Sequence, residues 1–534
     1  MKRIIINIII TILVAFIAFY ITLPAININN PKFYLFVGFI LLVYGILDAI
    51  RVDQIKVIRK GKNYNFKLKN RDGAFPIILA ILGISFILIL LTNFICSPIF
   101  NAKSYQQRIT VETGNFTEDI EEVNFNQLPL LDKSSSQVLG DRVMGEISEL
   151  VSQYYVSSLY TQINYNNEIL RVTPLEYADF FKWLSNKKHG VVGYITVNSV
   201  NGESKLKRLD KGMKYVSSGY FNDNLERKLR FSYPFENFGK ISFEIDNEGN
   251  PYYIVTTIKY TAFGLKAKVK GVIIFDPITG DSKKYDLDDI PTWVDVAYSA
   301  SLIIEQVDDW GSYKNGYWNS IFGQKDVVNT TEGYNYLAMN DDVYLYTGIT
   351  SVVSDESNLG FILTNMRTGK TTYYNVPGAE EYSAMSSAEG QVQDMGYVST
   401  FPLLINLNNR PTYLVSLKDS NGLVKMYGFV DVKDYQKVSV TDVSKGILVA
   451  RDNYLKQIKV EAKDEELTIE EIKVDSIKEA TINGNSIYYI EAKDKKFKAP
   501  ISLSDNLPFI KVGDTIKIGY YASENDIIEI EKIY

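Results

Sequence analysis

The run IIINIIITILVAFIAFYITLPAI, residues 4–26, is the first of three long apolar segments that decide the fold class of this chain. The second segment covers Phe33–Ile50, and the third extends from Phe75 to about Ile95. A helix of about 20 apolar residues crosses the roughly 30 Å of hydrocarbon in a bilayer. We therefore expect residues 1–100 to form a three-helix transmembrane anchor.

The first segment also resembles a secretory signal peptide, with Met1-Lys2-Arg3 as its basic start. It is long for that purpose, however, and no small-x-small cleavage site follows it. The sequence therefore favours a helix that stays in the membrane.

Positive charges predict the orientation of these helices. The loop Arg51–Ala74 contains eight Lys or Arg and two Asp, whereas the Asn27–Lys32 turn contains one Lys. Because Lys and Arg resist translocation, we expect the N-terminus and the basic loop to be cytoplasmic. Residues 101–534 are then extracytoplasmic, and Asp48 lies near the cytoplasmic end of its helix as an interfacial cap. A basic loop could also bind nucleic acid, but its position beside a membrane favours the orientation signal.

The charge balance differs between the anchor and the rest of the chain. Residues 1–100 contain 11 Lys or Arg and 3 Asp or Glu, whereas the remaining 434 residues contain 46 and 60. Nucleic-acid binding needs clustered cations, so an acidic exterior argues against such a partner. A segment of this length is sufficient for two to four compact domains.

Two residue types occur only once in the chain. The single cysteine, Cys96, excludes an intrachain disulfide, and we interpret it as a small hydrophobic side chain at the outer end of the third run. The single histidine, His189, excludes zinc sites built on several histidines. It lies in Asn186-Lys187-Lys188-His189-Gly190, a pattern typical of a helix C-terminus rather than of an acid–base catalyst.

Residues 101–240 are predicted to be a stalk followed by an α+β region. The stretch 101–136 is polar and poorly periodic. Apolar residues at helical spacing predict a helix over Gln137–Tyr160. A second helix is predicted over Arg171–Lys188, because Thr173-Pro174-Leu175-Glu176 combines a capping box with proline at the first helical position. Asn201-Gly202 indicates a β-hairpin.

The region 241–440 contains internal repeats. The pattern Ile245-Asp246, Pro251, Tyr253, Val255 recurs 160 residues later, and the pattern Gly271, Asp276, Thr279-Gly280, Tyr285 recurs 89 residues later. The matching positions are Ile405-Asn406, Pro411, Tyr413 and Val415 in the first case, and Gly360, Asn365, Thr368-Gly369 and Tyr374 in the second. We expect two related α+β units, each a curled antiparallel sheet with a helix on one face. The helices are predicted over Ala297–Trp310 and Ala379–Met395.

Two resemblances add to this interpretation. The helix–strand–strand–strand order of Ala379–Val432, with Tyr252-Tyr253-Ile254-Val255 and Phe275-Asp276-Pro277-Ile278-Thr279-Gly280, resembles bacterial PepSY-type modules. That resemblance implies extracytoplasmic binding or inhibitory domains without catalytic residues.

The chain also resembles large membrane proteins of low-GC Gram-positive bacteria, which carry loose labels of cell shape or colicin V production. This second resemblance rests on Leu128-Pro-Leu-Leu-Asp132, Leu139-Gly-Asp-Arg142, Arg171-Val-Thr-Pro-Leu-Glu-Tyr177, Gly333-Tyr-Asn-Tyr336 and Gly378-Ala-Glu-Glu-Tyr-Ser-Ala-Met385. It implies an envelope location and supplies no active-site residues.

The C-terminal part is predicted to be a helix and linker over 441–468 and a small β-barrel over 469–534. The helix covers Val443–Ile458, and Glu461–Glu466 is a charged linker. Short strands separated by Asn483-Gly484 and Val512-Gly513-Asp514 are typical of an OB- or SH3-like barrel. The strands are predicted over Glu471–Ile477, Ser486–Ala492, Lys496–Ser502, Thr515–Tyr521 and Ile527–Tyr534.

Known catalytic signatures are not recognisable. Ser185-x-x-Lys188, Ser204-x-x-Lys207 and Ser504-Asp505-Asn506 match single elements of penicillin-binding enzymes, but in the wrong order and without Lys-Thr-Gly. Asp286–Asp289 and Asp341-Asp342 lack the spaced oxygen ligands of a Ca²⁺ loop and indicate solvated turns. We therefore predict no catalytic, cofactor-binding or metal-binding residues, and leave the ligand-binding residues unassigned.

The leading hypothesis is a non-enzymatic, membrane-anchored extracytoplasmic binding or scaffold protein of the bacterial cell envelope. Its partners would be envelope proteins or cell-wall polymer. Two alternatives stay open: a subunit of an envelope transport or secretion complex, and a carboxylate-dependent cell-wall hydrolase. Gly38, Gly45 and Gly83 would support the first alternative if they packed against partner helices.

Overall fold

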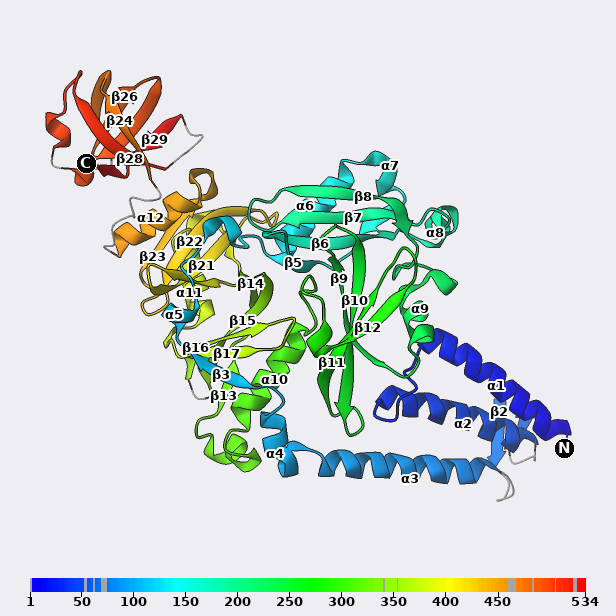
Figure 1. Ribbon diagram of the computed structural model, residues 1–534. Helices are drawn as coiled ribbons and strands as arrows, with labels where there is room; N and C mark the ends of the chain where they lie inside the picture. The colour runs from blue at the N-terminus through cyan, green and yellow to red at the C-terminus, as the bar shows by residue number, and fades with distance from the viewer. Residues whose placement is uncertain are drawn as a thin grey trace. The chain divides into compact units, whose positions relative to one another are not determined.

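A computed structural model describes two compact units of this chain (Figure 1). The residues that it describes are 2–51, 55–60, 63–68, 74–339, 341–352, 354–458, 467–482, 485–504, 506–521 and 526–534. The first unit comprises Met1–Thr113, Ser136–Asp355 and Phe361–Tyr373, and the second comprises Gly114–Ser135, Glu356–Gly360 and Tyr374–Tyr534.

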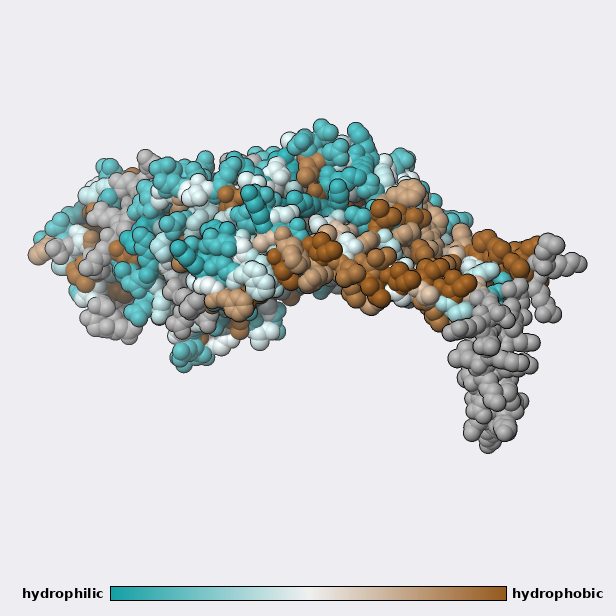
Figure 2. All heavy atoms as spheres, turned by 90° about the horizontal axis from the view of Figure 1, so that it is seen from below, coloured by the Kyte–Doolittle hydropathy of each residue, from teal (hydrophilic) through white to brown (hydrophobic). Residues whose placement is uncertain are grey.

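Three N-terminal helices are long and apolar enough to cross a membrane, as the sequence predicted. They are α1 (Lys2–Thr22), α2 (Pro31–Arg51) and α3 (Ala74–Ile95). The helix α2 contacts both α1 and α3. Hydrophobic side chains gather over these helices in Figure 2, because isoleucine, leucine and phenylalanine on their outer faces are exposed. A mixed, sheet-rich α/β body follows them.

Two of the three glycines considered for partner contacts pack inside the chain. A Cβ at Gly45 would lie 3.0 Å from the Phe75 ring, and one at Gly38 would lie 3.6 Å from Leu82. These glycines let α2 approach α3 closely. A Cβ at Gly83 would meet nothing within 4 Å, so this position is open.

Asp48 caps a helix, although not its own. Its carboxylate accepts a hydrogen bond of 2.7 Å from the backbone N–H of Ala74, the first residue of α3. This hydrogen bond ties α2 to the start of α3. Asp48 is 1% exposed, so it does not reach water as expected, and its place at a membrane interface stays a prediction. Between these helices lies an antiparallel hairpin, β1 (Ile55–Lys60) and β2 (Asn63–Leu68).

The predicted stalk and the helix that follows it differ from the structure. Residues 98–151 form short elements rather than a loose stalk and one long helix: α4 (Pro98–Gln106), β3 (Val111–Gly114), α5 (Phe116–Asp119), η1 (Phe125–Gln127), α6 (Lys133–Gly145) and α7 (Ser148–Val151). The helix predicted to Tyr160 ends early, because the chain from Tyr154 pairs with a neighbouring strand. Sheet pairing overrides the helical periodicity there.

The next sheet corrects the helix predicted over Arg171–Lys188. Residues 171–177 belong to a strand and are all buried; 171–174 pair with neighbouring strands on one or both sides, and 175–177 pair with the strand Tyr154–Val156. Thr173 donates to the Ser157 carbonyl oxygen instead of capping a helix. The real cap is Asp179, whose carboxylate accepts from Phe181 N and Lys182 N. The elements are β4 (Tyr154–Val156), β5 (Thr161–Tyr165), β6 (Glu168–Tyr177), α8 (Phe180–Asn186), β7 (Val191–Asn198) and β8 (Ser204–Met213). The β7–β8 hairpin turns at Asn201-Gly202, as predicted.

Three antiparallel meanders follow, each preceded by a helix. The first contains η2 (Phe221–Asp223), α9 (Leu225–Ser232), β9 (Asn237–Ile245), β10 (Pro251–Thr261), β11 (Lys266–Phe275), β12 (Ser282–Asp286) and η3 (Leu287–Asp289). The second contains α10 (Ala300–Ser312), η4 (Asn319–Gly323), β13 (Val328–Thr330), β14 (Asn335–Met339), β15 (Asp342–Ser351), β16 (Ser354–Asn365) and β17 (Thr371–Tyr374). The third contains β18 (Gly378–Ala379), α11 (Glu381–Gly390), η5 (Gln393–Met395), β19 (Val398–Ser399), β20 (Leu403–Leu407), β21 (Arg410–Lys418), β22 (Val424–Asp431) and β23 (Val438–Asp442). Strands pair in the order β9-β10-β11-β12 in the first and β20-β21-β22-β23 in the third.

The same turn closes all three meanders. The side chains of Asp276, Asn365 and Asp431 each accept two backbone N–H groups from the turn that follows. The next carbonyl then accepts from the backbone at the start of the same meander. The N–H of Tyr215 donates to Pro277 O, that of Tyr298 to Met366 O, and that of Ala379 to Val432 O, at 2.9, 2.8 and 2.7 Å. This turn therefore occurs three times, whereas the sequence pattern marked it twice, and the division into two PepSY-like units stays a prediction.

Glycine is required at two of these turns. Gly280 and Gly369 have φ values of 82° and 75°, a region that favours glycine. An added Cβ would also lie 2.5 Å from the Tyr215 ring in the first case and 2.6 Å from the Tyr298 ring in the second. The Thr-Gly pairs noticed in the sequence thus mark a close contact between the turn and the start of the meander.

The C-terminal strands share one hydrophobic core. The elements after the third meander are η6 (Val443–Lys445), α12 (Ile447–Gln457), β24 (Thr468–Lys473), β25 (Ser476–Ile482), β26 (Asn485–Ala492), β27 (Lys495–Pro500), η8 (Ile501–Leu503), η9 (Leu507–Phe509), β28 (Thr515–Tyr520), β29 (Ile527–Glu529) and β30 (Lys532–Ile533). The strands pair as β24-β28-β30 and β25-β26-β27-β29 around residues such as Ile490, Phe497 and Ile518. The predicted strands 471–477 and 527–534 are each divided into two. The charged linker and the Asn483-Gly484 turn lie outside the described residues.

Candidate functional site

The loop between α1 and α2 is hydrogen-bonded to the body of the first unit. Ile26 N donates to the Pro234 carbonyl oxygen at 2.8 Å, and Asn27 Nδ2 donates to Phe235 O at 2.9 Å. Asn30 Nδ2 donates to Asn237 Oδ1, also at 2.8 Å. Residues 234–237 therefore lie beside this loop, at the Thr22 end of α1 and the Pro31 end of α2.

Arg230 of α9 also binds the loop between α1 and α2, through a hydrogen bond to Leu23 O. Its guanidinium is buried and donates to the carbonyl oxygens of Leu23, Tyr233 and Glu236, at 3.1, 3.1 and 2.7 Å. It also lies 4.1 Å from the centroid of the Phe238 ring. Burial lowers the pKa of Arg230 to about 10, but the group stays charged and its donors face carbonyl oxygens.

The tip of the β10–β11 hairpin makes a second contact with the helices. Asn93, near the end of α3, accepts from Phe263 N at 3.2 Å and donates to Phe263 O at 3.4 Å. The Phe263 ring meets the Tyr34 ring of α2 edge-on, with centroids 5.2 Å apart. Asn29 Nδ2 donates to Tyr260 O. The Thr22 end of α1, the Pro31 end of α2 and the Ile95 end of α3 thus lie beside the first meander, and we call these contacts the membrane junction.

Glu176 of β6 is a buried carboxyl group. It accepts hydrogen bonds from the backbone N–H of Ser218, at 2.9 Å, and from the Ser218 hydroxyl. Burial raises the pKa of Glu176 to about 7, although the Ser218 hydrogen bonds oppose the shift. A proton on this side chain is therefore exchanged near neutral pH.

Glu244 and Asp295 form a second buried acidic site. Asp295 N donates to Glu244 Oε2 at 2.8 Å, Ser242 Oγ donates to Glu244 Oε1, and Asn164 N donates to Asp295 Oδ2. Burial raises the pKa of Glu244 to about 7, and burial together with the nearby Glu244 raises that of Asp295 well above its usual range. The two residues are 0% and 1% exposed, so the pair can hold protons but presents no surface to a polymeric substrate.

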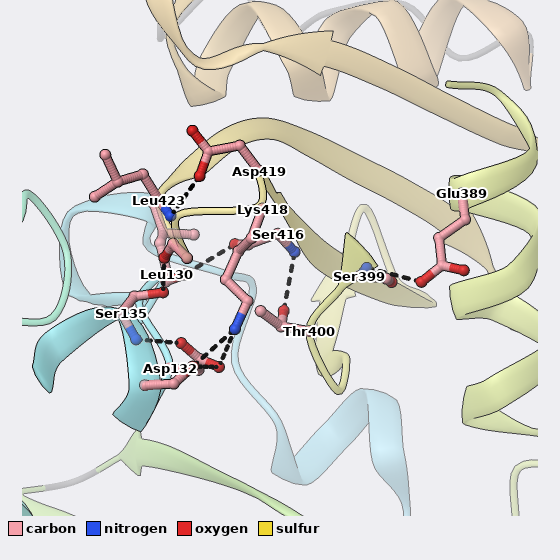
Figure 3. A network of polar contacts seen from close by, with 12 residues as sticks. Leu130, Asp132, Ser135, Glu389, Ser399, Thr400, Ser416, Lys418, Asp419 and Leu423 are labelled. Carbon is pink, nitrogen blue, oxygen red and sulfur yellow. Dashed lines mark hydrogen bonds and ion pairs between the residues drawn. The ribbon is translucent and has the colours of Figure 1, made fainter. Parts of the chain in front are cut away.

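The second unit has a different polar network, drawn in Figure 3. Lys418 Nζ donates to Asp132 Oδ2 at 2.7 Å and to Ser134 Oγ at 2.8 Å. Ser416 Oγ donates to Leu130 O at 2.8 Å. The segment 114–135 is thereby fixed to β21, a strand nearly 300 residues later in the chain.

At Asp132, hydrogen-bonding partners outweigh the effect of burial on the pKa. Partial burial raises the pKa of Asp132, but hydrogen bonds from Lys418, Ser135 and Ser134 lower it to about 2 overall. The ion pair is therefore present throughout the physiological pH range, and it acts as a structural clip rather than as a proton-exchanging group.

A second network holds the block Gly378–Met385. Asn358 Nδ2 donates to Glu381 Oε2 at 3.0 Å and to the Tyr413 hydroxyl at 3.1 Å. Tyr413 in turn donates to Ala379 O at 2.9 Å. Tyr413 is fully buried, as are Tyr253 and Tyr346 on the corresponding strands of the other meanders.

The residues singled out in the sequence are dispersed in the structure. His189 is exposed just after α8, where Gly190 N donates to Asn186 O, as expected at a helix C-terminus. Cys96 is half-buried after α3 and is a free thiol. Ser185 donates to Phe181 O within α8, and Ser204 donates to Gly202 O in a hairpin. Asp505 lies outside the described residues.

The solvated turns predicted from the sequence are correct for Asp288 and Asp289, which are exposed, and wrong for Asp342, which is buried. Asp342 binds Arg367 through two hydrogen bonds of 2.8 Å and accepts from Asn365 at 2.7 Å. Asp288 and Asp289 lie in the short turn η3. Within the described part of the chain, no group of three or more His, Cys, Asp or Glu could hold a metal ion.

Sequence reasoning missed Glu176, Glu244, Asp295 and Arg230. Glu244 gave no signal, because in Ile241-Ser-Phe-Glu244-Ile245 it falls on the polar side of the alternation, which a half-buried strand turns to solvent. No signal marks Arg230 either, because one of its acceptors, the Leu23 carbonyl oxygen, lies 207 residues earlier.

Comparison with known proteins yields no relative: no protein-family model matches the chain, and no curated protein matches it.

Proposed function

We propose that this protein is a membrane-anchored, extracytoplasmic binding or scaffold protein of the bacterial cell envelope. The single observation that carries the proposal is the membrane junction, where three helices able to span a membrane are attached to a large ordered body. A body bonded to its anchor at several points is suited to presenting a surface at a fixed place on a membrane.

Sidedness follows from combining the junction with the charge pattern. The basic loop Arg51–Ala74 favours the cytoplasm. The loop 23–30 lies at the opposite ends of α1 and α2, and the junction places it beside residues 234–237 and 260. A multi-pass topology with a cytoplasmic N-terminus and residues 101–534 outside satisfies both observations.

Binding, rather than catalysis, is supported by the position of the carboxyl groups. A carboxylate-dependent hydrolase needs two carboxyls in an open cleft, one of them with a raised pKa. The carboxyls whose pKa values are raised most, Glu176, Glu244 and Asp295, are 3% exposed or less. We propose that the three meanders form PepSY-like recognition modules and that the C-terminal strands form a small OB- or SH3-like barrel as a second binding element.

The topology can be tested with single cysteines in a Cys96→Ser background. We expect a membrane-impermeant maleimide to label Asn201→Cys in intact cells, and Lys62→Cys only after permeabilisation. The two positions are matched controls for each other, since one lies on the predicted outer side and the other in the basic loop. Labelling of Lys62→Cys alone in intact cells would reverse the orientation and refute the proposal.

The binding role needs a second experiment. Crosslinking of intact cells followed by purification of the protein should recover envelope proteins or cell-wall polymer in a fixed ratio. A known envelope complex crosslinked in the same cells serves as the control. If that complex is fully crosslinked and this protein is still repeatedly recovered by itself, a scaffold role is contradicted.

One observation favours a transport or secretion subunit as a second candidate. An apolar groove of about 570 Å³ lies between α1 and α2, and residues such as Ile17, Ile21 and Phe36 line it. Gly83 on α3 is also open. If partner helices occupy these places, a crosslinker at Gly83→Cys will capture a membrane protein, whereas a lipid-filled surface will yield no such adduct.

A further inference from the structure

A hydrophobic face on the first unit is exposed without a partner among the described residues. Phe181 and Leu184, on the outer side of α8, are 71% and 45% exposed, and Phe221 in η2 is 58% exposed. We call these three residues the aromatic face. Soluble surfaces rarely gather large apolar side chains in this way unless they bind a partner or a membrane.

The aromatic face rests on a rigid second layer. Phe180, Trp183 and Tyr220 lie behind it, with ring centroids 5.0 to 5.5 Å apart. The Trp183 ring also lies 5.7 Å from that of Phe221. The exposed side chains are therefore held in place, and their exposure does not result from a loosely packed loop.

The face is continuous with the outer end of α1. Arg227 donates from Nη1 to Phe221 O and from Nε to Tyr20 O, the latter at 3.3 Å. Its guanidinium also lies 4.1 Å from the Tyr20 ring centroid, and Phe231 meets Phe19 edge-on at 5.6 Å. Phe221 is thus one side chain away from Tyr20, which lies two residues before the end of α1. Tyrosine at such a position marks the membrane–water interface.

Figure 1 shows α8 and α9 at the edge of the first unit from which α1 and α2 extend. Residues 179–189 contain three lysines and one aspartate. Lys187 and Lys188 are exposed, and Lys187 Nζ lies 5.0 Å from the Trp183 ring centroid. Exposed aromatic residues with lysines beside them are the composition of surfaces that lie at the level of lipid headgroups.

We propose that the aromatic face lies in the interfacial layer of the membrane that α1–α3 cross, on the side of the loop 23–30. The occupant of this face is therefore lipid: Phe181, Leu184 and Phe221 lie among the upper acyl chains, and Lys187 and Lys188 lie near phosphate groups. The inference rests on α1 being a membrane-spanning helix, but not on which side of the membrane is outside. A body held by both the junction and this face has one fixed tilt relative to the membrane.

The test uses the full chain in lipid nanodiscs, where both membrane sides are accessible and orientation does not matter. Single cysteines are introduced by Leu184→Cys and Phe221→Cys in the Cys96→Ser background and labelled with an environment-sensitive fluorophore. The matched control is Asn201→Cys, which follows the far end of β7. This strand begins after α8 and extends about 25 Å, at roughly 3.3 Å per residue. Nitroxide-labelled lipids with the spin label near the headgroup end serve as quenchers.

We expect blue-shifted emission at positions 184 and 221, and quenching about threefold stronger than at position 201. Two labelled positions keep the test valid if one variant misfolds, and circular dichroism of each labelled protein verifies folding. Water-like emission at both positions, with quenching equal to that at 201, would overturn the proposal and assign the face to a protein partner. The proposed sidedness would be unaffected, because the intact-cell labelling reports it separately.

Discussion

The region around β6 and β9 in the first unit and the sheet β20–β23 in the second bury carboxyl groups in opposite ways. Among the described residues, no lysine or arginine forms an ion pair with Glu176, Glu244 or Asp295. In the second unit, Asp132 pairs with Lys418 and Asp431 pairs with Arg410. Burial alone raises a carboxyl pKa, whereas a hydrogen-bonded cation can lower it despite burial.

The two regions therefore respond to pH with opposite signs. Glu176 and Glu244 bind protons more tightly in the folded state, so their contribution to the free energy of unfolding falls as pH rises from about 4.5 towards 7. Asp132 binds its proton less tightly when folded, so its contribution is complete above about pH 4 and is lost as pH falls towards 2. The region around β6 and β9 is therefore predicted to lose stability as pH rises to neutral, and the segment 114–135 is predicted to lose it in acid.

The largest effect is expected for Glu244→Gln. The amide mimics the protonated acid and removes the need to ionise a fully buried group, so it should stabilise the first unit at about pH 8 by about 3 kcal/mol. At about pH 5 the gain should disappear, because the wild-type side chain is already protonated. Scanning calorimetry of the purified protein at both pH values measures the difference. An equal shift at both pH values would show that packing, not ionisation, is responsible.

Glu176→Gln should act in the same direction with a gain no larger, about 3 kcal/mol at about pH 8, because burial raises the pKa of Glu176 to about 7 as well. The readout is the unfolding temperature as a function of pH. Glu226→Gln is the matched control, since Glu226 is a neighbouring, half-buried carboxyl that accepts from Ser217. A pH-dependent gain of the same size in the control would exclude Glu176 as its source.

Lys418→Met removes the cation that pairs with Asp132, and so makes this carboxyl more like the buried ones around β6 and β9. Asp132 then lies partly buried without its strongest partner, and we expect a local loss of about 1–2 kcal/mol. Hydrogen exchange of residues 120–135 should accelerate roughly tenfold. Lys425→Met, which removes a longer ion pair of 3.6 Å to Asp419, should leave that exchange unchanged. Identical exchange in the Lys418 variant would mean that the clip contributes no stability.

Arg410→Ala is expected to have the smallest effect, about 1 kcal/mol or less, because Asp431 keeps the N–H groups of Lys433 and Asp434. The measurement is the denaturant midpoint of the second unit, with circular dichroism as the readout. Arg410→Lys should recover most of the loss. A loss above about 3 kcal/mol would indicate that the ion pair is as important as a fully buried one.

Strong local signals in the sequence predicted the corresponding structure correctly. The three apolar runs, the Asn201-Gly202 hairpin and the helices near Ala300 and Glu381 needed no knowledge of distant contacts. The prediction for Arg171–Tyr177 was wrong for the opposite reason. The capping box and Pro174 favour a helix locally, but the segment pairs with the strands β4, β5 and β7, and every residue of it is buried. The third occurrence of this turn, at Asp431, was not predicted, because Asp431 is not followed by Thr-Gly.

The site residues were harder to predict than the fold. Glu244 and Asp295 are 51 residues apart, and only the folding of β9 against the segment before α10 brings them together. Arg230 and Leu23 are separated by a still longer stretch that includes two helices of the anchor. Without a matching family, such pairs cannot be recognised from spacing along the chain.

The hydrogen bond between the start and the closing turn of each meander has a consequence for how the chain grew. Entry and exit of each meander lie beside each other, so a whole meander can be copied or deleted without stretching its neighbours. Closed segments of this kind also retain much of their structure when an adjacent segment opens under mechanical load.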